Sequence, residues 1–327
     1  MERLPPFALH RPTSVDEATA LLAGNPGARV IAGGTDLVPN LRDGLGAPPV
    51  LVDLGTVAGL DGLVVDGSGI RIGAGVTLAR LAADPDIARA LPAVAQAAAA
   101  IAAPGHRSVA TVGGNLCVDT RCVYYNQSEW WRRSNAYCLK HGGDTCHVAP
   151  QGTRCHAAFA GDLAPALLVA GAAVAIAGPR GPRTVALDAL YRDDGRAHLT
   201  LDVGEIVAAV LVPAQPVGAR SAYRKARARA AIDFPLAGVA VRLALDAGRV
   251  RSLDVALTGT NPRPFRLDGT DAFGGRAVDD ALQAELGKLV QRQVSPMRTT
   301  VNAANWRRQV AAVMAQRLVR ELTGGAP

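Results

Sequence analysis

Residues 30–37 read VIAGGTDL, an apolar run that stops at two adjacent glycines and continues into Thr35 and Asp36. Residues 110–115 read ATVGGN and repeat the arrangement. Paired glycines let backbone N–H groups approach an anion closely, and neighbouring Thr and Asn side chains add hydrogen bonds. Two such turns that converge on one diphosphate would form a nucleotide-binding site. The alternative is a pair of unrelated tight turns that need φ > 0, because GG pairs are common in loops.

The better-known glycine frameworks for nucleotides are missing from this sequence. Residues 73–78, GAGVTL, hold the first two glycines of a Rossmann fingerprint and lack the third, and no strand–helix unit of the right form follows. No P-loop motif is present either. A nucleotide bound by this chain would therefore use another framework.

The residues around the first glycine pair predict a small α/β unit. Ser14 and Glu17 have the spacing of a capping box, so we expect a helix over 15–24 that ends at a glycine. Short strands are expected over 28–32 and 49–54.

The sequence that follows predicts a larger central part. Thr77 is an expected N-cap, because a helical segment follows it directly. Periodicity places helices and strands over 69–75, 78–84, 93–103, 161–178, 183–191 and 205–213.

Beyond Pro213 the pattern changes. Alternating segments at 221–245 and 249–259 predict an antiparallel sheet, and helices are expected over 278–293 and 302–322. We therefore expect an α+β protein with a C-terminal antiparallel sheet and helices. The expected parts are 1–55, 56–213 with an insert at 117–155, and 214–327.

Composition argues against a membrane or secreted protein. The 327 residues are 49% hydrophobic and 4% aromatic, and no apolar run reaches the roughly 18–20 residues that span a bilayer. The first residues, MERLPPFALHRP, lack the charged-then-apolar layout of a signal peptide. A cytoplasmic protein with no membrane partner is expected, and its cysteines would stay reduced or bind metal.

The net charge of +7 raises the question of nucleic acid. Arginines are spread along the chain, and their densest run, YRKARARA at 223–230, is typical of a strand or turn with solvated side chains. A basic pI alone is weak evidence. We expect no nucleic-acid partner; a basic surface facing an acidic electron carrier agrees with the charge at least as well.

All five cysteines lie between Cys117 and Cys155, spaced C-x4-C-x15-C-x7-C-x8-C. The odd count and the expected compartment disfavour disulfides. Structural zinc sites usually use C-x2–4-C pairs, which only the first two cysteines approach, although His141, His147 and His156 could complete such a site. An iron–sulfur cluster takes four thiolates, and irregular spacings occur. Zinc, iron–sulfur and inert buried thiols all remain open on spacing alone.

The ordered series AGGTDL, IGAGVTL, TVGGNL, GDLAPAL, EIVAAVLVP and YRKAR…DFPLAGVAV resembles the FAD-binding subunits of the molybdenum hydroxylase (xanthine dehydrogenase) family. The resemblance covers nearly the whole chain. It implies a two-part FAD-binding region at 1–55 and 56–213. It also implies that the glycine turns hold the FAD diphosphate, while Asp162, Ile101, Ala102 and Lys225 lie near the flavin. The implied FAD-binding residues are Val30, Ile31, Ala32, Gly33, Gly34, Thr35, Asp36, Leu37, Ile101, Ala102, Ala110, Thr111, Gly113, Gly114, Asn115, Asp162 and Lys225.

The cysteine-bearing insert is similar to that of the beta subunits of 4-hydroxybenzoyl-CoA reductases, a branch of this family. That resemblance implies a [4Fe–4S] cluster held by Cys122, Cys138, Cys146 and Cys155, with Cys117 outside it as a packed residue. Aromatic residues of the insert would wrap the cluster or pack the insert onto its domain: Tyr124, Tyr125, Trp130, Trp131 and Tyr137.

The same resemblance implies an electron-transfer subunit with no acid–base catalyst of its own. Electrons would pass from a ferredoxin-like donor through [4Fe–4S] and FAD to a small subunit with two [2Fe–2S] clusters. They would then reach a large molybdenum subunit that reductively dehydroxylates 4-hydroxybenzoyl-CoA to benzoyl-CoA, in a dimer of heterotrimers. One alternative is the flavin subunit of another molybdenum hydroxylase that acts on an aromatic or heterocyclic substrate. An alternative of another class is a zinc-stabilised nucleotide-binding scaffold.

Overall fold

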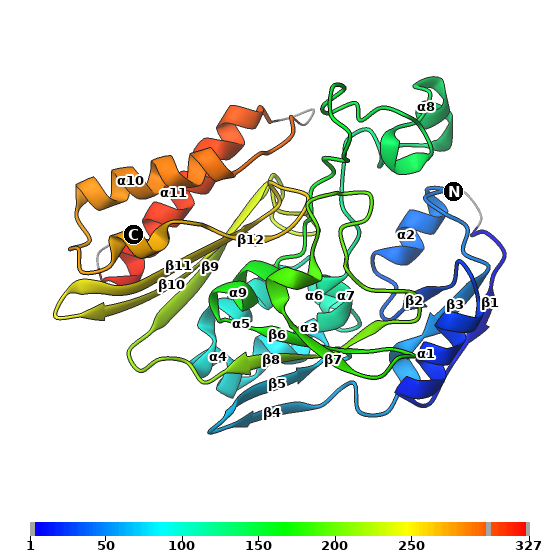
Figure 1. Cartoon of the computed structure of the whole chain (residues 1–327), viewed down its shortest axis with the longest axis horizontal. Helices are drawn as coiled ribbons and strands as arrows, with labels where there is room; N and C mark the ends of the chain where they lie inside the picture. The colour runs from blue at the N-terminus through cyan, green and yellow to red at the C-terminus, as the bar shows by residue number, and fades with distance from the viewer. Residues whose placement is uncertain (1–3, 299–301, 325–327) are drawn as a thin grey trace.

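The N-terminal part of the chain forms a three-stranded parallel sheet in the order β1-β3-β2, in a computed structural model that describes residues 4–298 and 302–324 (Figure 1). Its strands and helices are β1 (Ala8–His10), α1 (Val15–Gly24), β2 (Arg29–Ile31), α2 (Leu37–Arg42) and β3 (Val50–Asp53). The hydroxyl of Ser14 accepts a hydrogen bond from the backbone N–H of Glu17 at 3.2 Å, so the predicted N-cap of α1 is confirmed.

The central part is a five-stranded antiparallel sheet in the order β4-β5-β8-β6-β7. Its strands are β4 (Leu63–Asp66), β5 (Gly69–Gly73), β6 (Ala173–Ala177), β7 (Arg183–Ala186) and β8 (Ile206–Pro213). Short helices pack beside the sheet: α3 (Leu78–Ala83), α4 (Pro85–Ala90), α5 (Pro92–Ala100), α6 (Pro104–Arg107), α7 (Val112–Leu116) and α9 (Leu163–Val169). With few aromatic residues available, Ala, Val, Leu and Ile fill most of this core.

The C-terminal part is a four-stranded antiparallel sheet in the order β12-β11-β10-β9, as the alternating segments predicted. Its strands are β9 (Arg220–Ala226), β10 (Ala237–Asp246), β11 (Arg249–Thr258) and β12 (Phe265–Arg266), and its long helices are α10 (Asp280–Gln293) and α11 (Ala304–Leu322). Leu286, Val290 and Leu318 from these helices share one apolar core with Val241 and Leu257 of the sheet. The strands also contact α5 and α9, so the sheet lies between the two sets of helices. The α+β class is confirmed, whereas the domain boundaries at 55 and 213 stay predictions.

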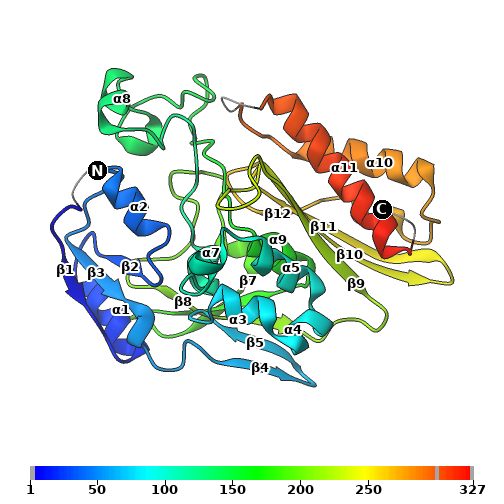
Figure 2. The same cartoon turned by 180° about the vertical axis from the view of Figure 1, so that it is seen from behind.

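The cysteine-bearing segment 117–155 extends away from the central part. Figures 1 and 2 show it as a lobe in which α8 (Glu129–Ser134) lies above α2. Apart from α8 it holds only the 3-10 turn η2 (Leu139–His141). Elsewhere among the described residues, 3-10 turns are formed by η1 (Leu54–Thr56), η3 (Leu187–Leu190) and η4 (Thr270–Phe273).

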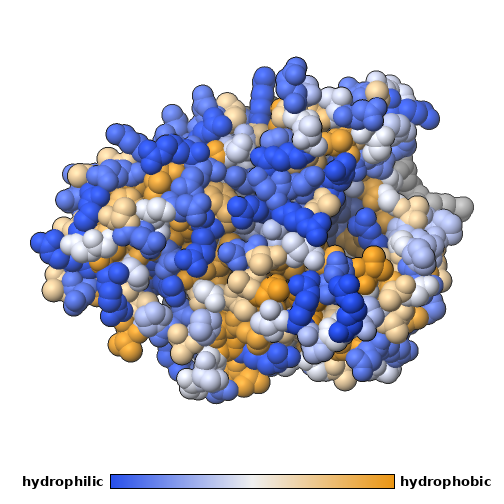
Figure 3. All heavy atoms as spheres, in the orientation of Figure 1, coloured by the Kyte–Doolittle hydropathy of each residue, from blue (hydrophilic) through white to orange (hydrophobic). Residues whose placement is uncertain are grey.

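Polar residues cover most of the face in Figure 3, and apolar residues gather toward its lower edge. No helix within residues 4–298 and 302–324 has both the length and the apolar character needed to cross a membrane.

Candidate functional site

The first glycine turn joins β2 to α2 and lies directly against the segment that leads into the second turn. Gly34 has φ +68°, a left-handed conformation that favours glycine. At Gly33 the backbones are so close that an added Cβ atom would lie 2.1 Å from the carbonyl oxygen of Val109. Because Val109 immediately precedes residues 110–115, the structure brings the two predicted turns side by side.

The second glycine pair differs from the expected loop, because it forms the first turn of α7. The Thr111 hydroxyl caps this helix by accepting from the N–H of Gly114 at 3.1 Å. The N–H of Gly113 donates to the carbonyl of Ala74 at 2.8 Å, and a Cβ atom on Gly113 would lie 2.8 Å from the Ala74 Cβ. The glycine at 113 is therefore needed for close packing against the GAGVTL segment.

The third motif, GDLAPAL, is tied to the second glycine turn and to β9. The Asn115 side-chain oxygen accepts from the N–H of Leu163 at 3.0 Å. The Asp162 carboxylate accepts from the Tyr223 hydroxyl at 2.6 Å and from the Lys225 ammonium at 3.1 Å. Burial raises the pKa of Asp162, and the charge of Lys225 opposes that rise. Three of the predicted cofactor residues thus belong to one connected group.

Ile101 and Ala102 lie beside that group, at the end of α5. The Lys225 ammonium also lies 3.3 Å from the carbonyl of Ala100. Ala102 has φ +43°, which is rare for a residue with a side chain, and its carbonyl accepts from the N–H of Ile232 at 3.2 Å. Strained backbone of this kind is often found at binding sites, and the position of Ala102 beside a flavin stays a prediction.

Arg121, which sequence reasoning did not select, connects the first glycine turn to the insert. Its guanidinium forms an ion pair with the carboxylate of Asp36 and donates to the side-chain oxygen of Asn40 at 2.6 Å. It also lies over the ring of Phe234, 4.6 Å from the centroid. Burial lowers the pKa of Arg121 to about 10, which leaves it charged at neutral pH. Its position directly before Cys122 was the only sequence signal.

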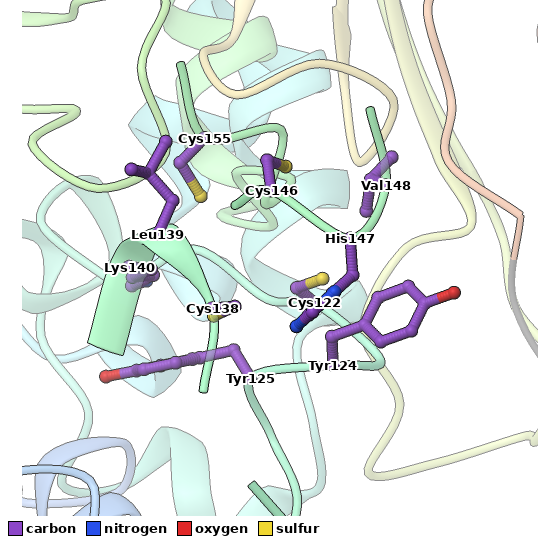
Figure 4. Close-up of a pocket in the computed structure, with 10 residues that line it drawn as sticks. All are labelled: Cys122, Tyr124, Tyr125, Cys138, Leu139, Lys140, Cys146, His147, Val148 and Cys155. Atoms are coloured by element: carbon purple, nitrogen blue, oxygen red, sulfur yellow. The ribbon is translucent and has the colours of Figure 1, made fainter. Parts of the chain in front are cut away.

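Four of the five cysteines line one pocket within the insert (Figure 4). Their exposed fractions are 9% for Cys122, 8% for Cys138, 4% for Cys146 and 5% for Cys155, and none of the five is in a disulfide. The pocket is completed by Tyr124, Tyr125, Leu139, Lys140, His147 and Val148. The structure therefore brings together the four cysteines that the resemblance selected, and it leaves Cys117 outside them.

A preformed site for a metal ion is not present: across residues 4–298 and 302–324, no group of three or more His, Cys, Asp or Glu side chains is arranged to hold one. Of the three histidines considered for zinc, only His147 lines the thiol pocket, and its Nε2 atom lies 2.5 Å from the carbonyl oxygen of Tyr137. His141 instead contacts the rings of Tyr125 and Tyr137.

The aromatic residues of the insert divide between two roles. Tyr124 and Tyr125 line the pocket, and Tyr137 donates from its hydroxyl to the carboxylate of Glu129 at 2.8 Å. The prediction for Trp130 was wrong: its side chain is 67% exposed, because it lies on the outer face of α8. Trp131 points the other way, with its ring 6.1 Å from that of Tyr124.

The insert is anchored to the rest of the chain by buried charges and apolar contacts. Arg132, whose side chain is 1% exposed, donates to the carbonyls of Asp43 and Gly44, each at 3.1 Å. Leu45 and Met297 pack with Cys122, Cys138 and Cys155 in a single apolar cluster. That cluster therefore draws on three distant parts of the sequence, whereas the residues that line the pocket all belong to the insert.

Comparison with known proteins identifies the family to which this architecture belongs. Residues 5–215 match the family described as the FAD binding domain in molybdopterin dehydrogenase, and residues 221–322 match the CO dehydrogenase flavoprotein C-terminal domain. The aldehyde oxidoreductase FAD-binding subunit PaoB of Escherichia coli is 34% identical over 85% of this chain and 90% of its own. The carbon monoxide dehydrogenase medium chain of Afipia carboxidovorans is 28% identical over 96% of this chain and 95% of its own.

Solved structures agree with the sequence relatives. Reconstituted CO dehydrogenase from Oligotropha carboxidovorans has a chain that superimposes with a TM-score of 0.82, at 26% identity, covering 99% of this chain and 100% of that one. The chain belongs to the FAD-binding subunits of the molybdenum hydroxylase family that includes xanthine dehydrogenase and CO dehydrogenase. It is accordingly an FAD-binding oxidoreductase subunit.

Proposed function

We propose that the chain is the electron-transfer subunit of a multi-subunit molybdenum hydroxylase, with FAD on the paired glycine turns and a [4Fe–4S] cluster in the insert. The observation that supports the cluster is the gathering of four buried cysteines around one pocket. The contact of Gly33 with Val109 supports the FAD site, because it brings both turns to one place.

The FAD site is proposed from the residues that the two turns and the Asp162 group supply. Backbone N–H groups of the first turn would bind the diphosphate, since glycine lets the backbone approach closely, whereas the N–H groups of Gly113 and Gly114 already donate to Ala74 and Thr111. The proposed residues are Val30, Ile31, Ala32, Gly33, Gly34, Thr35, Asp36, Leu37, Ile101, Ala102, Ala110, Thr111, Gly113, Gly114, Asn115, Asp162 and Lys225. Because Asp36 already pairs with Arg121 and Asn40, its carboxylate would mainly hold the turn in place.

The donor set of the insert fits an iron–sulfur cluster, which takes four cysteine thiolates. Cys122, Cys138, Cys146 and Cys155 would each ligate one iron. Tyr125 and Val148 would keep water from the cluster, and Lys140, which pairs with Asp119 at 2.7 Å, lies at the pocket wall. When bound, such a cluster passes single electrons to or from a flavin, which itself exchanges one or two.

Partners and substrate are proposed from the relatives. The names FAD-binding subunit and medium chain indicate that this chain also works beside other subunits, which would carry the molybdenum centre and two [2Fe–2S] clusters. A ferredoxin-like protein is the proposed external electron partner, and a dimer of heterotrimers is the proposed assembly. Aldehyde and aromatic or heterocyclic oxidation fit the relatives better than 4-hydroxybenzoyl-CoA reduction, because an aldehyde oxidoreductase and a nicotine hydroxylase are among them.

Reduction of 4-hydroxybenzoyl-CoA remains the second candidate, favoured by the four-cysteine insert. An assay of the assembled complex separates the two. The first proposal expects reduction of an electron acceptor by aldehydes or heterocycles. Turnover of 4-hydroxybenzoyl-CoA with a low-potential reductant, and of none of the others, would support the second.

The cluster is tested by chemical analysis of the intact complex, prepared without oxygen. The insert is expected to contribute about four iron atoms and four acid-labile sulfides beyond those of the small subunit, with one FAD per chain. Cys138→Ser should lose this iron and still bind FAD, though less tightly, whereas Cys117→Ser should keep the iron and the full FAD affinity. Zinc without labile sulfide in the insert would refute the cluster and support the scaffold alternative.

A further inference from the structure

Helix α2 begins at the first glycine turn and is held at both ends by arginines of the insert. At its start, Arg121 pairs with Asp36 and donates to Asn40. Just beyond its end, Arg132 donates to the carbonyls of Asp43 and Gly44. The segment that places the first glycine turn therefore depends on side chains from the loop that carries the four cysteines.

The contact at Arg121 is the more direct of the two, because it reaches the turn itself. One oxygen of the Asp36 carboxylate pairs with the guanidinium of Arg121. The other oxygen accepts a hydrogen bond from the side-chain amide of Asn40 at 3.2 Å. The side chains of Arg121 and Asp36 are 21% and 27% exposed, so water competes only partly for the pair. The neighbouring Cys122 is one of the four cysteines at the pocket.

The backbone fixes Arg121 from the other side. Its N–H donates to the carbonyl of Ala158 at 2.8 Å, and its carbonyl accepts from the N–H of Ala158 at 2.8 Å. Ala158 packs with Cys122 and Cys155 in the apolar cluster of the insert. A change in the order of the cysteine loop would thus move the guanidinium relative to Asp36.

We propose that Arg121 is a positioning residue that couples FAD affinity to occupation of the thiol pocket. The inference rests on the proposed function, since it takes the four cysteines as the ligands of a cluster. The cluster orders the loop, the ordered loop holds Arg121 against Asp36 and Asn40, and the first glycine turn is thereby held in its binding conformation. Coupling of this kind is reciprocal, so FAD should also order the insert.

A double-mutant cycle on the full chain tests the coupling. FAD is removed and its dissociation constant is measured by flavin fluorescence for the wild type, Cys146→Ser, Arg121→Met and the double variant. Each single variant should weaken FAD binding by roughly five- to tenfold, and the double variant should be no weaker than either single one, because both interrupt the same connection. Arg121→Lys should recover part of the affinity.

The chain offers a matched control in Arg242. Arg242 pairs with Asp254 at 2.8 Å and donates to the Gln215 side-chain oxygen. The side chains of Arg242 and Asp254 are 17% and 12% exposed. Like Arg121, Arg242 pairs with one carboxylate and one side-chain amide, but it lies in the C-terminal sheet, away from both glycine turns and the insert. Arg242→Met should therefore leave the FAD dissociation constant unchanged.

The outcomes separate this inference from the function on which it rests. Iron analysis comes first, and a wild-type insert without iron refutes the cluster itself. If the wild type holds iron, Cys146→Ser does not, and both bind FAD equally, the coupling is overturned while the cluster stands. Additive effects in the double variant also overturn it.

The reciprocal measurement needs no variant and covers the case in which Arg121→Met does not fold. Addition of FAD to the wild type should slow proteolytic cleavage within 117–155. An unchanged cleavage rate overturns the coupling.

Discussion

The Nζ atom of Lys225 lies 3.1 Å from the Oδ2 atom of Asp162, and the two side chains are 3% and 4% exposed. Lys225 is on β9 of the C-terminal sheet, and Asp162 directly precedes α9 in the central part. A single buried ion pair therefore joins these two parts of the chain beside the second glycine turn.

Removing one partner of this pair should be costly. Lys225→Met is expected to lower the free energy of unfolding by about 3–5 kcal/mol, because it leaves a buried carboxylate without its counter-charge. Lys225→Met combined with Asp162→Asn should recover part of the loss. Urea unfolding at neutral pH measures both, and a single variant as stable as the wild type would contradict the assignment.

Gly33→Ala should separate the glycine turns. The new Cβ atom would lie 2.1 Å from the carbonyl oxygen of Val109, so the backbones must move apart. We expect a penalty of about 1–3 kcal/mol, seen mainly as weaker FAD binding in a fluorescence titration. Gly24→Ala is the control, because nothing lies within 4 Å of that position. Equal FAD affinity in the two variants would show that the contact between the turns is unimportant for FAD.

Arg132→Ala should loosen the insert, whereas Arg133→Ala, one residue along α8, should not. Arg132 is buried and holds the carbonyls of Asp43 and Gly44, while Arg133 is exposed. Loss of a buried, multiply bonded guanidinium typically costs about 2–4 kcal/mol, here expected within the insert. Faster proteolysis of 117–155 and lower iron content in Arg132→Ala alone are the expected readouts. Identical digestion of the two variants would refute the anchoring role.

The Arg183–Glu205 pair predicts a specific loss of stability in acid. Hydrogen bonds from Arg183 lower the pKa of Glu205 from its ordinary 4.5 to about 2. The unfolded chain therefore binds the proton first, so this stabilisation is complete above about pH 4.5 and is lost as the pH falls toward 2. Glu205→Gln should lower stability by about 1–3 kcal/mol at neutral pH and by much less near pH 3.

Denaturant unfolding at both pH values checks this difference. The control is Glu285→Gln, since Glu285 forms a similar two-bond pair with Arg276 but its side chain is 55% exposed. That substitution should change stability little at either pH. A pH-independent effect of Glu205→Gln would contradict the assigned pKa.

Local signals in the sequence predicted most of the fold. Ser14 and Thr77 accept the N-cap hydrogen bonds expected of them, because capping depends only on residues three positions apart. The alternating segments after Pro213 form the antiparallel sheet, since their period of two marks one buried face.

Only part of the candidate site could be predicted from the sequence. The four pocket cysteines were selected through a family resemblance, and spacing alone left zinc and iron–sulfur open. Arg121 could not be predicted, because its partner Asp36 lies 85 residues away and no periodic pattern links them. Trp130 was misplaced for a similar reason: which face of a short helix is buried depends on what packs against it.

Met297, near the C-terminal end of the chain, packs in one apolar cluster with Cys122, Cys138 and Cys155. During synthesis the four thiols leave the ribosome well before residue 297 does, so for some seconds Cys122, Cys138 and Cys155 lack their apolar contact with Met297. If iron is inserted after the whole chain has been synthesised, the cluster would form in an apolar surrounding. Earlier insertion would leave the cluster exposed to oxygen and water. Under the proposed cluster, the C-terminal part of this chain would set the time at which a centre to which it supplies no ligand can mature.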